Sequence, residues 1–296
     1  MNILLCGSSG FIGHNITKAL IAAGHRVIPT RSPASRGDDD QAIAVDFSRD
    51  TNPAVWLARL KGVDAVVNAV GVLRDTRQRP IQVVHAEVPK ALYTACAQAG
   101  VRRVIHVSAL GIEGSDTAYA QTKLAADRHL LGLTEQGQLD GVVLRPSIVF
   151  GAQGDSSKLF MGLAQLPALL LPQAMIKARI QPVAVGDLAL AIARLLSEAR
   201  TLTGVLPCVG PTPLSMADFI GSLRQQLGKS KALVMPLPGF MTTLSARIGD
   251  QIPAMPFCTE TLSLLDQDNV APAEAFTEVL GRRPIGHQDL VTTSWH

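Results

Sequence analysis

The sequence predicts an α/β fold built on a doubly wound parallel sheet, and two patterns in its first half support this. Short apolar runs rich in β-branched residues alternate with longer helical patterns. Continuous apolar strands are buried on both faces, which is typical of parallel strands joined by helical crossovers. A glycine-rich loop also separates the first run from the first helical pattern. We therefore predict one such domain over residues 1–150.

The elements of this domain are expected in the following order along the chain. The runs predicted as strands are NILLCG (2–7), HRVIPT (25–30), QAIAVD (41–46), DAVVNAVG (64–71), RRVIHVSA (102–109) and DGVVLRPSIVFG (140–151). The segments predicted as helices are FIGHNITKALIAAG (11–24), PKALYTACAQAG (89–100) and YAQTKLAADRHLLG (119–132). Each helix is expected to end at its glycine, Gly24, Gly100 or Gly132, because glycine best adopts the left-handed C-terminal conformation.

After about residue 151 the chain has more proline and longer irregular stretches, which predicts a smaller substrate-side region over 151–296. A strand and a helix are expected near 179–199, with Asp187 as the N-cap. The run GVLPCVG is expected to return to the main sheet. Parts of about 180–210 would then rejoin the first domain, so the two regions are predicted to interleave.

Composition excludes two classes of protein. Hydrophobic residues make up 47% of the chain and charged residues 17%, which excludes intrinsic disorder. The net charge is only +3 and the basic residues are scattered, which argues against a nucleic-acid partner. Some of the apolar surplus is expected to line a pocket for an apolar small molecule.

The cysteines indicate a reducing compartment. Cys6, Cys96, Cys208 and Cys258 are far apart without metal-ligand spacing, so we expect free buried thiols, no metal site and a cytoplasmic location. The N-terminus runs directly into an apolar strand, so no signal peptide is expected.

The most apolar segment is residues 159–176, which Pro167 and Pro172 interrupt. These prolines make it a poor membrane span, so no transmembrane segment is predicted. A pocket lid and a contact with a membrane surface both stay open as readings.

The loop GSSGFIG carries three glycines in a GxxGxxG arrangement at the start of a helix. Glycines let the backbone approach a pyrophosphate, and a helix N-terminus offers free N–H groups and partial positive charge. The alternative is a glycine-rich turn without a ligand. We predict dinucleotide binding by Gly7, Ser9, Gly10, Phe11, Ile12 and Gly13.

The second strand ends without an acidic residue, and Arg31 stands at its end. An acid there would bind the ribose 2′-hydroxyl of NAD, whereas an arginine favours the 2′-phosphate of NADP. We therefore predict NADP over NAD, with a surface role for Arg31 as the alternative and Arg36 as a neighbour that bears on the choice.

Two further segments are expected near the cofactor. Asp46, which closes the third strand, is expected to face the adenine amino group or to be a helix N-cap. The NAVG segment follows the fourth strand and is placed for backbone contact with the cofactor, although such turns are common. Its residues are Asn68, Ala69, Val70 and Gly71.

Tyr119 and Lys123 are four residues apart, which places them on one face of a predicted helix. A nearby ammonium favours phenolate over phenol and would lower the tyrosine pKa toward the working pH. The alternative is a surface tyrosine beside a solvated lysine.

These motifs together resemble the short-chain dehydrogenase/reductase superfamily. The resemblance continues through LRPSIVFG and QPVAVGDLALAI to the tail LSLLDQDNV, and so spans almost the whole chain. It is greatest to the atypical, extended branch that contains the NDUFA9-type accessory subunit of respiratory complex I and bacterial epimerase/dehydratase-like relatives. The resemblance implies a Rossmann fold that binds NAD(P), and some members of the branch look like structural NADPH binders.

The resemblance also implies roles for individual residues. Tyr119 would be the general acid/base, Lys123 would hold the nicotinamide ribose, and Ser108 would polarise a substrate carbonyl. His85 stands where members of the superfamily often carry an active-site asparagine, which puts a full proton relay in doubt. Pro146 matches a segment that passes beside the nicotinamide carboxamide.

Three functions remain open at this stage. The first is an NADP(H)-dependent oxidoreductase that acts on a carbonyl or alcohol of an apolar small molecule, with Ser108, Tyr119 and Lys123 as catalytic residues. The second is a non-catalytic NADPH-binding sensor or a structural subunit of a membrane-associated redox complex. The third is a nucleotide-sugar epimerase or dehydratase, for which the apolar 159–176 segment is a poor match.

Overall fold

The computed structural model describes residues 1–33, 42–73, 75–197, 202–238 and 268–295. Its centre is a seven-stranded sheet in the order β11-β6-β5-β4-β1-β2-β3. The strands are β1 (Asn2–Cys6), β2 (Arg26–Arg31), β3 (Ile43–Ala44), β4 (Ala65–Asn68), β5 (Arg103–Val107), β6 (Asp140–Pro146) and β11 (Gly204–Cys208). Neighbouring strands from β3 through β6 pair in parallel. Successive strands are added on one side of β1 up to β3 and then on its other side from β4 onward. The predicted doubly wound Rossmann sheet is therefore confirmed.

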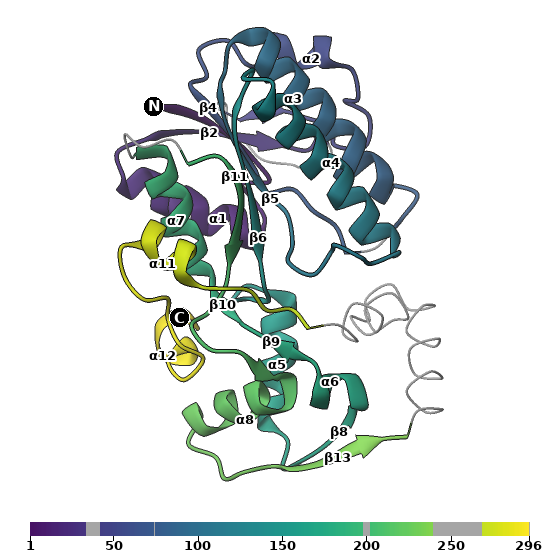
Figure 1. Cartoon of the computed structure of the whole chain (residues 1–296), viewed down its shortest axis with the longest axis vertical. Helices are drawn as coiled ribbons and strands as arrows, with labels where there is room; N and C mark the ends of the chain where they lie inside the picture. The colour runs from purple at the N-terminus through teal and green to yellow at the C-terminus, as the bar shows by residue number, and fades with distance from the viewer. Residues whose placement is uncertain (34–41, 74, 198–201, 239–267, 296) are drawn as a thin grey trace. The chain divides into compact units, whose positions relative to one another are not determined.

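Helices cover both faces of this sheet (Figure 1). One face carries α2 (Pro53–Leu57), α3 (Val88–Ala99) and α4 (Ala118–Glu135), and the other carries α1 (Phe11–Ala22) and α7 (Val185–Ser197). The core under the first face consists of strand residues packed on helix residues, among them Leu4, Val66, Val143, Trp56, Leu92 and Leu130. Their burial anchors the strand ends that carry the candidate site.

The predicted thiols are free and buried at Cys6, Cys96 and Cys208. Burial raises the pKa of the Cys6 thiol to about 12, so this thiol is inert as a nucleophile at neutral pH. Cys258 lies outside the described residues.

Two predicted helix ends are confirmed and one is wrong. Gly24 directly follows the C-cap of α1 and Gly100 is the C-cap of α3, and both have positive φ. Gly132 instead lies inside α4, which continues to Glu135. A helix passes through a glycine when the packing of its apolar face outweighs the local cost of about 1 kcal/mol. The left-handed residue that follows α4 is Gly137.

The expected N-cap role of Asp187 is also wrong. α7 begins at Val185, which places Asp187 in its first turn. The buried Asp187 carboxylate accepts hydrogen bonds from Arg282 and from the Ile285 backbone N–H. It therefore holds the C-terminal segment in place.

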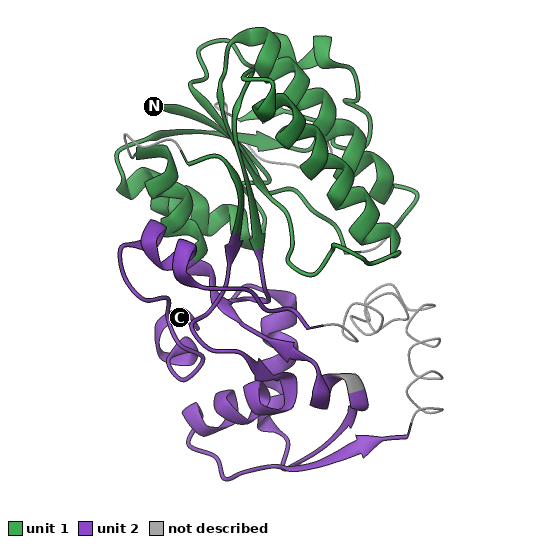
Figure 2. Cartoon of the chain, viewed as in Figure 1, with its two compact units in different colours: residues 1–145, 188–206 green, residues 146–187, 207–296 purple. Residues whose placement is uncertain are grey.

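The chain divides into two compact units (Figure 2). Unit 1 comprises residues 1–145 and 188–206, and unit 2 comprises 146–187 and 207–296. Residues 188–206 include most of α7 and part of β11, so the helix and the edge strand of the sheet come from the second half of the chain.

Unit 2 has its own aromatic core, in which Phe150, Phe160, Phe219 and Trp295 contact one another. Within its described residues the helices are α5 (Asp155–Gln165), α6 (Gln173–Lys177), α8 (Met216–Gln226), α11 (Glu274–Leu280) and α12 (Leu290–Ser294). Its remaining strands are β7 (Val149–Phe150), β8 (Ala168–Pro172), β9 (Arg179–Ile180), β10 (Val183–Ala184), β12 (Leu214–Ser215) and β13 (Leu233–Leu237).

The apolar 159–176 segment is divided between α5, β8 and the first part of α6. In β8 the side chains of Leu169 and Leu171 are buried, whereas Leu170 is 59% exposed. Among the described residues, none of the helices has the length and apolarity needed to cross a bilayer.

Candidate active site

The glycine loop after β1 is shaped by close backbone approaches. Gly7 has a φ of 84°, and a Cβ there would lie 3.1 Å from the backbone of Ala69. A Cβ on Gly13 would collide with the carbonyl of Gly7. The two glycines therefore let α1 and the loop after β4 pack directly against this turn.

The N-terminus of α1 is open to an anionic ligand. Its N-cap is Gly10, no acidic residue lies in its first turn, and Ser9 and Gly10 are exposed. Free N–H groups and the helix dipole favour a phosphate at such an end. The loop residues thus fit a dinucleotide pyrophosphate.

Arg31 is exposed at the end of β2, where the sequence predicts a contact with a 2′-phosphate. Its predicted neighbour Arg36 lies outside the described residues. Asp46 follows β3, and its carboxylate accepts from both the N–H and the hydroxyl of Ser48. Asp46 therefore caps a turn, and the helix N-cap nearby is Asn52, so the alternative of a helix N-cap at Asp46 is wrong.

The loop after β4 connects the glycine loop to the candidate catalytic residues. A Cβ on Gly71 would lie 3.5 Å from Lys123 Nζ and 3.7 Å from His85 Nε2. The Asn68 side chain is fully buried; its amide nitrogen donates to the Tyr93 hydroxyl at 3.1 Å, and its Oδ1 accepts from the Val70 N–H of the loop at 3.1 Å. The structure thus brings the 68–71 segment beside both the glycine loop and the predicted catalytic residue Lys123.

Lys123 lies on the inner side of α4 and is 4% exposed. Its Nζ donates to the Val107 carbonyl at 3.0 Å, at the end of β5. Burial lowers the pKa of Lys123 to about 8, and the negative charge of Asp127 opposes this shift. The ammonium is therefore held at the carboxyl end of the sheet, where α/β sheets bind ligands.

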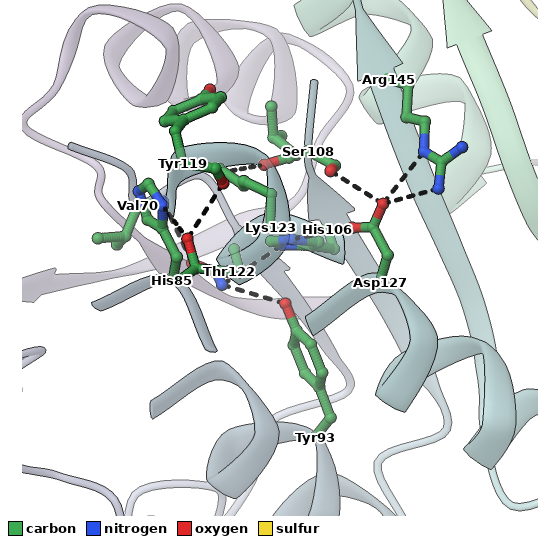
Figure 3. Close-up of polar contacts among 12 residues, drawn as sticks. Val70, His85, Tyr93, His106, Ser108, Tyr119, Thr122, Lys123, Asp127 and Arg145 are labelled. Atoms are coloured by element: carbon green, nitrogen blue, oxygen red, sulfur yellow. Dashed lines mark hydrogen bonds and ion pairs between the residues drawn. The ribbon is translucent and has the colours of Figure 1, made fainter. Parts of the chain in front are cut away.

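Tyr119 lies one turn before Lys123 on the same helix, and its ring contacts that of His85 edge-on at 5.4 Å between centroids (Figure 3). Burial, and then the negative charge of Asp127, raise the pKa of Tyr119 to about 12. The sequence predicted a lowered pKa, and this direction is wrong. Desolvation of the phenolate outweighs the attraction of a lysine whose own charge is disfavoured by burial.

His85 lies in a π-helix, η1 (Val83–Glu87), that precedes α3. Its Nε2 accepts from the Val72 N–H at 2.9 Å, and its Nδ1 lies 3.3 Å from the Thr122 hydroxyl. Burial and then Lys123 lower the pKa of His85 to about 3. The imidazole therefore stays neutral at physiological pH and holds the 71–72 turn against α4 without exchanging protons.

Ser108 belongs to a buried network that the sequence does not reveal (Figure 3). Its hydroxyl donates to Asp127 Oδ2 at 3.0 Å, and Arg145 Nη2 lies 3.0 Å from the same oxygen. Asp127 is fully buried in α4, one turn after Lys123. In the sequence, the sign of this network is a carboxylate on the same helix face as Tyr119 and Lys123. His106 Nε2 in β5 lies 3.5 Å from Asp127 Oδ1, and within the described residues both of these buried atoms are without a hydrogen-bond partner.

A first test uses the pH dependence of folding. In ligand-free protein Lys123 has a folded pKa near 8 against 10.5 unfolded, so its burial costs stability below pH 8. This cost disappears as the pH rises to about 10.5. We expect Lys123→Met to be stabilising relative to wild type at pH 7, with the difference decreasing by about 3 kcal/mol between pH 8 and 10.5. Urea unfolding at each pH measures this difference, and a constant difference would contradict the buried ammonium.

The comparison with known families decides the classification. Residues 3–204 match the NAD dependent epimerase/dehydratase family. The chain belongs to this family. Oxidoreductases, epimerases and dehydratases that depend on NAD(P) are its members, and the resemblance to the extended dehydrogenase/reductase branch is confirmed.

Curated relatives of this family member have names that indicate different functions. Subunit 9 of the NADH dehydrogenase 1 alpha subcomplex of Rattus norvegicus is 23% identical over 86% of this chain and 68% of its own. The divinyl chlorophyllide a 8-vinyl-reductase of Arabidopsis thaliana is 25% identical over 74% of this chain and 57% of its own. The UDP-glucose 4-epimerase of Vibrio cholerae is 25% identical, and the match covers about half of each chain (51% and 52%).

Solved structures show the same fold. The protein gox2253 superposes with a TM-score of 0.74 at 19% identity, covering 99% of this chain and 97% of its own. The UDP-glucose 4-epimerase of Thermus thermophilus, solved with NAD, has a TM-score of 0.70 at 20% identity, with 100% and 98% covered.

Pro146, which the resemblance places beside the nicotinamide carboxamide, is the buried last residue of β6 and lies in unit 2. In the described part of the chain, no group of three or more His, Cys, Asp or Glu side chains is arranged to bind a metal.

Proposed function

We propose that this family member is a cytoplasmic NADP(H)-dependent oxidoreductase acting on a carbonyl or alcohol of an apolar small molecule. The observation that carries the proposal is the convergence of the glycine loop, the 68–71 loop and Lys123 at the carboxyl ends of β1, β4 and β5. The nicotinamide would supply or accept the hydride when bound. The apolar substrate rests on the sequence, in which residues 159–176 form the most apolar segment.

Residues of the chain itself would bind the cofactor and transfer the proton. Gly7, Gly10 and the N-terminus of α1 would bind the pyrophosphate, and Lys123 would bind the nicotinamide ribose. Tyr119 would hold the proton that moves to or from the substrate oxygen. Its high pKa keeps it a phenol, which is the form that protonates a carbonyl oxygen during reduction.

The preference for NADP rests on Arg31 and on the absence of an acid at the end of β2. We expect NADPH to bind about ten- to a hundredfold more tightly than NADH, because an arginine contact with a phosphate contributes about 1.5–3 kcal/mol. Arg31→Ala should remove most of this difference and leave NADH affinity unchanged. Calorimetric titration of both proteins with both cofactors measures it. Equal affinities in wild type would favour the surface reading of Arg31.

The main alternative is a protein that binds NADPH without turnover, as a sensor or as a structural subunit of a membrane-associated complex. The similarity to the rat NADH dehydrogenase subunit favours this alternative. Mass spectrometry of nucleotide released from protein purified without added cofactor separates the two. Stoichiometric bound NADP and no activity against a carbonyl and quinone panel would support the structural role.

The third candidate, a nucleotide-sugar epimerase or dehydratase, is favoured by the similarity to the Vibrio cholerae epimerase. Incubation with UDP-glucose and NAD, followed by chromatography of the nucleotide sugars, tests it. Formation of an epimer or a 4-keto product would replace the proposed apolar substrate with a polyhydroxylated one.

A further inference from the structure

The strands β8 and β13 of unit 2 form a two-stranded parallel sheet (Figure 1). On one face of this sheet, Leu169 and Leu171 are buried in the core of the unit. Successive side chains of a strand point to opposite faces, so Leu170 lies on the other face. The register pairs Leu170 with Met235, and Leu233 lies two residues before Met235, so these three side chains share that face.

This second face exposes large aliphatic side chains to solvent. Leu170 is 59% exposed, Leu233 61% and Met235 41%. Leu166, just before β8, is exposed as well. Single exposed leucines are ordinary, whereas a group of them on one sheet face marks a surface that binds a membrane or another protein. We call Leu170, Leu233 and Met235 the aliphatic face.

The segments that form this sheet contain basic residues but no acidic ones. Residues 156–186 and 219–238 have neither Asp nor Glu. Lys229 and Lys231 stand just before β13, and Lys177 ends α6, which directly follows β8 and packs beside β13. All three lysines are exposed. Since the two strands are parallel, these lysines flank the aliphatic face at both ends of the sheet.

The other basic residues of these two segments contribute less free charge. Lys158 Nζ lies 3.5 Å from an oxygen of Asp155. The Arg179 backbone N–H donates to Asp268, which brings a carboxylate beside this arginine. Arg224 is buried and donates to backbone carbonyls. The positive charge around the aliphatic face therefore comes from its three flanking lysines.

We infer that the aliphatic face and its flanking lysines dock on the surface of an anionic lipid bilayer. Aliphatic side chains enter the boundary between head groups and acyl chains, while lysines keep their ammonium groups at the lipid phosphates. Lysine is depleted at interfaces between proteins, where aromatic residues and arginine are enriched. A leucine-rich face framed by lysines therefore fits a bilayer better than a protein partner. This inference goes beyond the proposed function and is compatible with each of the three candidate functions.

A second copy of this chain fits the face less well. β13 is an edge strand, and Pro236 removes one of the backbone donors that an added strand would need. Packing two aliphatic faces together would also bring like charges together, which is unfavourable. An anionic bilayer instead attracts these charges, with a gain in affinity of about fivefold for each lysine.

Vesicle flotation with the full chain measures this binding. We expect vesicles of roughly equal parts phosphatidylcholine and phosphatidylglycerol to bind about a hundredfold more tightly than vesicles of phosphatidylcholine alone, since three lysines contribute about fivefold each. High salt should remove most of this difference, because exposed charges are screened.

Two substitutions, each with a matched control in unit 1, test the two parts of the surface. Leu233→Gln should weaken binding to the mixed vesicles about tenfold, because the leucine no longer leaves water. Ile21→Gln is its control, since Ile21 is equally exposed at 61% but lies on α1. Lys231→Glu should weaken binding about tenfold or more, whereas the exposed Lys61→Glu should change it less than about twofold. All four side chains are exposed, and thermal unfolding checks that each variant is folded.

The outcomes separate this inference from the proposed function. Equal binding to the two kinds of vesicle, or equal effects of each substitution and its control, would overturn it. Absence of vesicle binding would overturn it too, whether another protein or a segment of this chain covers the face. A wild-type dimer that Leu233→Gln converts to a monomer, seen by light scattering, would replace the bilayer with a second copy. Vesicle binding with the expected effects in a protein without turnover would keep the inference and remove the oxidoreductase proposal.

Discussion

Tyr119→Phe is expected to lower the turnover of any accepted carbonyl by about 10² to 10⁴, the usual contribution of a positioned general acid. The change removes one oxygen and leaves the edge-on contact with His85 intact. Cofactor affinity should therefore hardly change. Stopped-flow measurement of NADPH oxidation gives the hydride-transfer rate, and calorimetry gives the cofactor affinity.

The chain offers a matched control, because its only other tyrosine is Tyr93. Tyr93 is fully buried in the core, where its hydroxyl accepts from Asn68. Tyr93→Phe should cost about 1 kcal/mol of stability and leave hydride transfer within a fewfold of wild type. Wild-type turnover in Tyr119→Phe would show that the YAQTK segment is an ordinary stretch of helix. If the substrate panel yields no activity and Tyr119→Phe changes neither cofactor affinity nor stability, the non-catalytic alternative is the better account.

Gly10→Val is expected to abolish dinucleotide binding, with an affinity loss of at least about a hundredfold, while the protein stays folded. Gly10 has φ −77° and ψ 167°, which any residue adopts, and a Cβ there would lie 3.3 Å from the Gly7 carbonyl. The fold should therefore tolerate the side chain. The valine would instead occupy the space in front of the α1 N-terminus, where charged hydrogen bonds to a pyrophosphate contribute about 1.5–3 kcal/mol each.

Two other glycines serve as controls for this experiment. Gly13→Ala places a Cβ against the Gly7 backbone and should lower stability by about 1–3 kcal/mol, because α1 must move from the turn. Gly132→Ala adds a methyl group inside α4 with nothing within 4 Å, and should raise stability by about 0.5–1 kcal/mol. Circular dichroism melts and calorimetric titration distinguish the three variants. Normal cofactor binding by Gly10→Val would mean that the dinucleotide lies elsewhere.

The sheet and the glycine loop were predictable because their signals are local. Apolar runs of strand length, helical periodicity and the GxxGxxG spacing each depend on a few neighbouring residues, and they led to the observed β1-loop-α1 unit. The same local reasoning failed at Gly132 and Asp187, where contacts distant in sequence override propensity. It also gave no sign of the π-helix around His85.

The sequence by itself determined the fold class, the dinucleotide loop and the shared helix face of Tyr119 and Lys123, since each follows from a spacing along one segment. Only the tertiary structure decided the environment of these side chains. Asp127, Arg145 and Ser108 come from α4, β6 and the end of β5, and no periodicity links them. Burial of the Tyr119 phenol, and then the charge of Asp127, raise the pKa of Tyr119, because desolvation and charge depend on distance in space and not along the chain.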